Sequence, residues 1–199
     1  MDKHVLDIAA RDITQLIHST INRPYEVAVA GGAVRDMARG FKPKDLDIVV
    51  AVGPDSCTAE VFSWMMTMSV TLSQLDIASE VFLAYTDEEA NCDSDFDEKL
   101  YGGIKIKHPV IEIDVLFSRK PSMSEAVEDF DCILNKLWTA DMRYVQGHVY
   151  VVDTSVQGMP YVASHARTER LDKMMALAIK YDGVPIVHNL DDLEEELRE

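Results

Sequence analysis

Two short apolar runs, separated by a pair of glycines and a short helical pattern, constrain the fold of this chain most. Tyr25 to Ala30 is a β-prone run that ends at Gly31-Gly32, as a buried strand followed by a tight turn would. Ala33 to Arg39 has helical composition, and Leu46 to Val52 is a second apolar run rich in β-branched residues. The order predicts a strand, a glycine turn, a short helix and a second strand.

The rest of the chain alternates between helical and strand-like patterns. Apolar residues recur at helical spacing over the first twenty positions, and Ser56 to Met68 and Arg167 to Tyr181 also favour helices. The further predicted strands are Val81–Tyr85, Gly103–Lys107, Val110–Phe117, Ile133–Trp138 and Val149–Val152, with a hairpin turn at Gly147. We therefore predict an α/β (α+β) fold, a mixed sheet with helices mainly on one face.

The composition limits the classes of partner. The chain of 199 residues has a net charge of -16, so a polyanionic partner would need a local basic patch. The three cysteines lack CxxC spacing, which argues against a disulfide framework or a zinc site. The sequence has no secretory signal and no run long enough to cross a membrane, so we expect a cytoplasmic protein.

Two pairs of carboxylates stand at strand spacing. Asp45 and Asp47 begin the second apolar run, and the two-residue period of a strand directs both to one face. Glu112 and Asp114 repeat the pattern in the run from Val110 to Phe117. Carboxylate oxygens suit magnesium, whereas the simpler alternative is that Glu112 and Asp114 lie on the solvated face of an edge strand.

The glycine pair adds a feature that favours phosphate binding. Gly31 and Gly32 lie where missing side chains would let backbone N–H groups approach phosphate oxygens. Arg35 and Lys44 add positive charge nearby. Four basic residues farther along the chain could form a basic rim for a polyanion: Lys105, Lys107, Arg119 and Lys120. The simpler alternative for the first two is that they are solvated lysines on a strand edge.

The stretch Gly31-Gly32-Ala33-Val34-Arg35-Asp36, followed by a short helix and Pro43-Lys44-Asp45-Leu46-Asp47-Ile48, resembles the head-domain signature of CCA-adding tRNA nucleotidyltransferases and bacterial poly(A) polymerases. The resemblance covers about twenty residues. It implies the polymerase β-type nucleotidyltransferase fold and transfer of a nucleoside monophosphate from an NTP, with ATP or CTP expected, to an acceptor hydroxyl. An RNA 3' end is the acceptor that the resemblance implies, which would place the protein in tRNA processing.

The resemblance also implies roles for individual residues. Asp45, Asp47 and Asp114 would be catalytic and would hold two Mg2+ ions, with Glu112 as the reserve for the third position. The glycine pair would face the triphosphate. A looser resemblance over Arg167 to Lys180 covers the helix that follows the family's head, and it places Arg170 and Lys173 near family arginines that select the nucleotide.

This resemblance predicts two parts in the chain. Residues 1–160 would form the nucleotidyltransferase head, and residues 161–199 a neck-like helix with an acidic extension. The chain ends soon after Tyr181, so we expect a short form without the helical body that grips RNA. Two alternatives remain: a compact nucleotidyltransferase that modifies a protein or small molecule, and a non-catalytic nucleotide-binding module.

Overall fold

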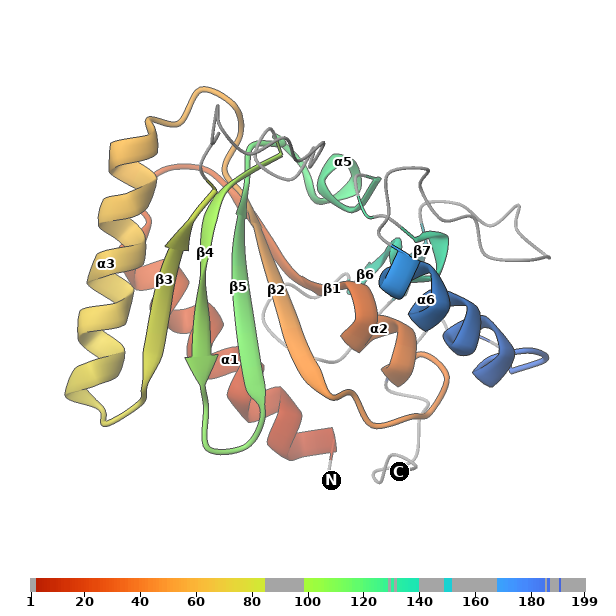
Figure 1. Cartoon of the computed structure of the whole chain (residues 1–199). Helices are drawn as coiled ribbons and strands as arrows, with labels where there is room; N and C mark the ends of the chain where they lie inside the picture. The colour runs from red at the N-terminus through yellow and green to blue at the C-terminus, as the bar shows by residue number, and fades with distance from the viewer. Residues whose placement is uncertain are drawn as a thin grey trace.

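The computed structural model describes residues 3–84, 99–128, 130, 132–139, 149–151, 168–184, 186 and 190. They form one seven-stranded sheet in the order β3-β4-β5-β2-β1-β6-β7 (Figure 1). The strands are β1 Glu26–Ala30, β2 Asp45–Ala51, β3 Ser79–Leu83, β4 Leu100–Lys107, β5 Glu112–Ser118, β6 Leu137–Thr139 and β7 Val149–Val151. The helices are α1 Lys3–Thr20, α2 Gly31–Met37, α3 Thr58–Gln74, α5 Met123–Glu128, the 3-10 helix η1 Ile133–Asn135, and α6 Thr168–Lys180.

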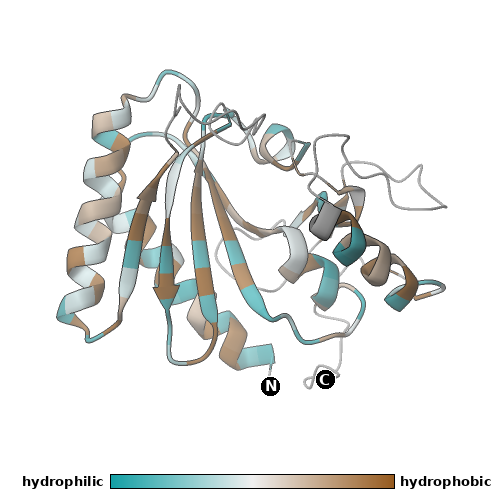
Figure 2. Cartoon of the chain, viewed as in Figure 1, coloured by the Kyte–Doolittle hydropathy of each residue, from teal (hydrophilic) through white to brown (hydrophobic). Residues whose placement is uncertain are grey.

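The main core lies between α1, α3 and one face of the sheet. Ile48 of β2 and Val115 of β5 are fully buried there, together with Leu6 of α1 and Met65 of α3. Figure 2 shows the alternation of hydrophobic and hydrophilic residues along β2 and β5 that makes this possible. The strand period of two thus buries every second side chain and directs the others to the opposite face.

The opposite face of the sheet is covered over only part of its length. A smaller apolar cluster joins α5 to β1 and β2, and its members are Ala28, Ala30, Val49, Ala51, Met123, Ala126 and Val127. Phe130 and Trp138 pack against its edge. Toward the N-terminal end of β2, apolar residues on this face give way to polar ones, which are visible as hydrophilic bands on β2, β5 and β4 in Figure 2.

Strand pairing is antiparallel except at the centre of the sheet. β2 and β5 are parallel and in register from Asp45 opposite Glu112 to Ala51 opposite Ser118. A parallel pair requires a long crossover, and here α3, β3 and β4 lie between the two strands in the sequence. Central strands of this kind are the best-supported part of a sheet, because both edges are hydrogen-bonded.

Most of the predicted elements are confirmed. The helix at the N-terminus, both strands around the glycine pair, the strands at β3 to β5 and the helix at α6 all occur. The sheet is mixed, as predicted. No helix among the described residues is long and apolar enough to cross a membrane.

Four details differ from the prediction. α3 continues to Gln74, and α5 was not predicted. The run Ile133–Trp138 is a strand only at its end, because its first three residues form η1. Gly31 and Gly32 are the first residues of α2 rather than a loop before it. β6 and β7 pair as a hairpin, but the turn predicted at Gly147 and the acidic end 191–199 lie outside the described residues.

Gly102 is a position where the sheet leaves no room for a side chain. Its φ is 149°, and an added Cβ would lie 2.3 Å from the carbonyl oxygen of Phe82. We expect Gly102→Ala to lower the free energy of unfolding by roughly 3 kcal/mol, from combined strain and overpacking. Gly40→Ala is the matched control, since its φ of 73° is also positive but open space surrounds it; roughly 1 kcal/mol is expected there. Urea unfolding measures both, and equal losses would contradict the steric argument.

Candidate active site

The register of β2 and β5 brings the predicted carboxylates together. Asp47 lies directly opposite Asp114, and Asp45 directly opposite Glu112. Directly paired residues point to the same face of a sheet, and this is the face that α1 and α3 leave uncovered. Four acids from two neighbouring strands therefore form two adjacent rows.

The two rows differ in their exposure to solvent. Asp45 and Glu112 are exposed, whereas Asp47 and Asp114 are half-buried. Burial raises the pKa of the Asp114 carboxyl, and the negative charges of Asp45 and Glu112 raise it further. Lys105, directly opposite Asp114 on β4, acts in the other direction. The site thus concentrates negative charge that a cation would stabilise.

Gly31 joins this acid cluster to α2. Its φ is 69°, and an added Cβ would lie 3.2 Å from Asp47 Oδ2 and 3.2 Å from the Phe130 ring. Only glycine combines this positive φ with such a close approach at low cost. The backbone at the start of α2 therefore lies directly beside the Asp47 carboxylate, and the predicted phosphate and metal sites are adjacent.

A buried hydrogen-bond network lies beneath the glycine pair. Arg35 and Asp36 are only 7% and 8% exposed. Arg35 Nε donates to Asp36 Oδ1 over 2.7 Å, and Arg35 Nη1 donates to Asn135 Oδ1 over 2.7 Å. Arg35 Nη2 is the nearest atom to the space that a Gly32 side chain would fill, at 3.5 Å. The guanidinium thus supports the glycine turn from within the protein.

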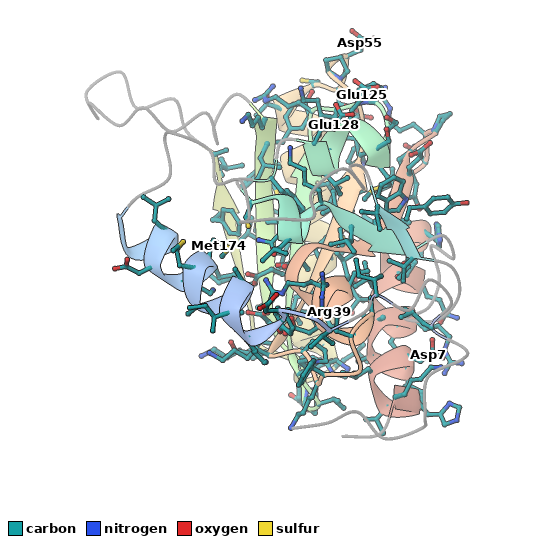
Figure 3. The ribbon with its side chains drawn as sticks, turned by 90° about the vertical axis from the view of Figure 1, so that its right-hand side faces the viewer. Asp7, Arg39, Asp55, Glu125, Glu128 and Met174 are labelled. Carbon is teal, nitrogen blue, oxygen red and sulfur yellow. The ribbon has the colours of Figure 1, made fainter. Side chains whose placement is uncertain are left out.

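The same network holds α6 against α2 and η1. The Tyr181 hydroxyl, just after α6, donates to Asp36 Oδ1 over 2.6 Å, and Met174 is buried with its sulfur 3.9 Å from Asn135 Nδ2. The Arg39 guanidinium lies over the Tyr181 ring at 5.2 Å from its centroid. Figure 3 shows Met174 on α6 and Arg39 near the end of that helix. The motif Arg35-Asp36 therefore anchors the C-terminal helix.

The pKa values of this network follow from its burial and its charges. Burial alone would lower the pKa of Arg35, but the hydrogen bond and charge of Asp36 outweigh it and the pKa is raised. Burial lowers the pKa of Arg39, and the positive charge of Arg35 adds to the effect. Burial raises the pKa of Tyr181, and its hydrogen bond to Asp36 raises it further. Tyr181 is thus a neutral donor over the whole physiological range.

Two of the other residues predicted to bind the nucleotide have exposed side chains. Lys44 is exposed just before β2, and Lys173 is exposed on α6. Arg170 belongs to α6, but its side chain lies outside the described residues. The edge-strand alternative for Glu112 and Asp114 is wrong, because β5 lies between β4 and β2. Nor is Lys105 on a strand edge, since β4 lies between β3 and β5.

The donor set fits magnesium. Within the described ranges, no three His, Cys, Asp or Glu side chains converge on one point. Magnesium takes only one or two protein carboxylates and leaves its other positions to water and phosphate. The neighbouring carboxylates of Asp47 and Asp114 meet that requirement. Burial, more than the nearby acids, raises the pKa of Asp114, and a bound cation would stabilise its charged form.

Sequence reasoning missed several residues that organise the site. Asp36, Asn135 and Tyr181 complete the network around Arg35. Phe130 closes the other side of Gly31. Asp36 was available as part of the motif that starts at Gly31, but nothing in the sequence linked it to Tyr181, far along the chain.

Comparison with known proteins identifies the fold. A scan of the sequence against protein-family models finds no match, and a search of curated proteins finds none either. Among solved structures, a CCA-adding enzyme in complex with ATP matches 94% of this chain at 14% identity, with a TM-score of 0.52. A structure described as a tRNA-processing enzyme in apo form matches 87% at 15% identity, with a TM-score of 0.43.

The predicted mixed sheet with helices is therefore confirmed, and its fold is similar to that of the CCA-adding enzyme solved with ATP. It spans 40% of the first of these chains and 34% of the second.

Tyr181→Phe tests how α6 is anchored. Removing the hydroxyl leaves the buried Asp36 carboxylate with one donor fewer, and we expect a loss of about 1–3 kcal/mol in the free energy of unfolding near neutral pH. Because the folded-state pKa of Tyr181 is raised above 10.0, its stabilisation is complete below pH 10 and declines as the pH rises above it. The gap between wild type and variant should narrow there in denaturant titrations; a constant gap would contradict the assignment.

Proposed function

We propose that this chain is a magnesium-dependent nucleotidyltransferase that transfers a nucleoside monophosphate from an NTP to the 3' hydroxyl of an RNA. The observation that carries the proposal is the placement of Asp47 and Asp114 side by side, with Gly31 directly against the Asp47 carboxylate. The fold shared with a CCA-adding enzyme solved with ATP supports it, as does the signature from Gly31 to Asp47.

The carboxylates would hold the metal. Asp47 and Asp114 are the first ligands we assign, and Asp45 and Glu112 in the next row would extend the site to a second ion. Bound magnesium would lower the pKa of the acceptor hydroxyl and neutralise charge on the departing pyrophosphate. The repulsion between Asp114 and the neighbouring acids would thus decrease when magnesium binds with the substrate.

The start of α2 would take the triphosphate. Gly31 lies where a larger side chain would crowd Asp47 and Phe130, half-buried Gly32 follows it, and exposed Lys44 immediately precedes Asp45 of β2. Arg35 would act from below, because its guanidinium is fixed by Asp36 and Asn135 and faces Gly32. It would keep the turn in place and add positive charge without leaving its pocket.

The helix α6 would complete the nucleotide site. Its attachment through Tyr181 and Met174 would fix the helix backbone that carries Lys173 and Arg170. In this arrangement Asp45, Asp47 and Asp114 would be the catalytic acids, while Arg35 and α6 would position the nucleotide. Positioning and charge neutralisation supply most of the rate in phosphoryl transfer, so no separate protein base is required.

Asp47→Asn tests the proposed centre. We expect magnesium-dependent release of pyrophosphate to fall by about 100-fold or more, because a carboxylate ligand is lost, while the circular dichroism spectrum stays unchanged. Glu80→Gln is the control: Glu80 lies opposite Lys105 on the edge strand β3, in the same row but away from the acids. Undiminished activity of the Asp47 variant would refute the assignment.

A transfer assay with labelled ATP and CTP against total RNA and total protein tests the acceptor. Label that enters RNA 3' ends and is absent from Asp47→Asn reactions supports the proposal. Label found only in protein or small molecules would support nucleotidyl transfer but show that the acceptor is not RNA. Nucleotide binding without transfer to any acceptor would indicate a non-catalytic nucleotide-binding module.

A further inference from the structure

An aromatic pair extends the acid row across the sheet. Ala30 lies opposite Asp47 on one side and opposite Trp138 on the other, and Trp138 lies opposite Tyr150 of β7. Directly opposite residues share a face. The row therefore runs Tyr150, Trp138, Ala30, Asp47, Asp114, and both rings lie on the face of the proposed active site.

The two rings are stacked and differ in burial. Their centroids are 5.2 Å apart with 19° between their planes. Trp138 packs against the small apolar cluster beneath α5, which holds its ring in place. Tyr150 is 45% exposed. The pair thus consists of a supported inner ring and an outer ring that presents aromatic surface to solvent.

The distance between the pair and the acids suits a nucleotide. Trp138 is two strand spacings from Asp47, about 10 Å along the sheet, and only Ala30 stands between them in the row. Ala30 is fully buried, and half-buried Phe130 packs against the cluster to which Ala30 belongs. A base stacked on the rings would therefore lie on the same face of the sheet as the acids, with its sugar and phosphate within reach of them.

We propose that Trp138 and Tyr150 form a stacking platform for a nucleobase of the substrate. The inference deepens the proposed function and rests on it for the identity of the ligand. Both rings are uncharged and would bind mainly through their faces, so they would accept the base of either substrate without selecting among bases. The base belongs either to the 3' end of the acceptor RNA or to the incoming nucleotide.

Equilibrium binding tests the platform without requiring catalysis. The chain has two tryptophans, and Trp64 is 7% exposed, so quenching by a stacked base would report Trp138. One arm titrates a short single-stranded oligoribonucleotide of mixed sequence without NTP. The other arm titrates ATP and CTP without RNA. Weaker binding of the oligoribonucleotide after Tyr150→Leu, compared with wild type, would assign the platform to the acceptor. Weaker binding of ATP or CTP would assign it to the incoming nucleotide.

Tyr150→Leu removes the outer ring while keeping an apolar side chain over Trp138. We expect binding in at least one arm to weaken by about 5- to 100-fold, the usual effect of losing a stacking ring. Tyr150→Phe, which keeps the ring, should bind within about twofold of wild type. Phe62→Leu on α3 is a remote control with a similarly exposed ring, 38%, and should bind normally.

Thermal unfolding separates binding from stability. A Tyr150→Leu protein that melts like Tyr150→Phe but binds less tightly supports the platform. Equal affinities for Tyr150→Leu and wild type in both arms would overturn it. Two further results separate this proposal from the proposed function. If the wild-type protein shows quenching but no transfer activity, the platform stands and the proposed reaction is refuted. Quenching by Asp47→Asn equal to that of wild type would show that base stacking does not depend on the acid.

Discussion

The parallel, in-register pairing of β2 with β5 is the constraint on which the site depends. It buries Ile48 and Val115 on one face and, by the same alternation, places Asp47 beside Asp114 on the other. A shift of one residue in either strand would direct carboxylates into the main core. Burying unpaired charges there would cost more free energy than the fold gains from the pairing. The hydrophobic core therefore enforces the alignment of the acids.

The buried ion pair between Arg35 and Asp36 is the second organising contact. Removing two charges from water is costly unless their hydrogen bonds are satisfied, and here Asn135 and Tyr181 supply further partners. Those partners come from η1 and from the end of α6. Satisfying the hydrogen bonds of Arg35 and Asp36 thus fixes two elements that are distant in the sequence, and α2 is held by both of them.

Much of the fold could be predicted because its signals are local. The strand period in β2 and β5 and the helical periods of α1 and α6 are visible in the sequence, and the signature around Gly31 led to the fold that the chain shares with a CCA-adding enzyme. The pairing of β2 with β5 was not visible, because no local pattern states which strands are neighbours. α5 has six residues, too few for a clear helical period, and the apolar run beginning at Ile133 does not distinguish a 3-10 turn from a strand.

The sequence identified residues that the structure places together, but it did not show which protein groups they contact. The acids and glycines lie together around Asp47, although their chemistry remains a proposal. For Arg35 the sequence suggested a phosphate ligand, whereas its direct partners in the structure are protein groups, one of them Asn135. Such long-range partners depend on tertiary packing, and a single sequence contains no trace of them.

The burial of the Arg35–Asp36 pair has a practical consequence for handling the protein. Salt screens exposed charges strongly and buried pairs weakly, and contacts with a nucleic acid backbone weaken steeply as ions are added. A wash at high ionic strength would therefore remove adventitious RNA from the purified protein, while the contacts of α6 with α2 and η1 stay in place. The junction through Tyr181 would survive a purification step that removes the very partner the site is proposed to bind.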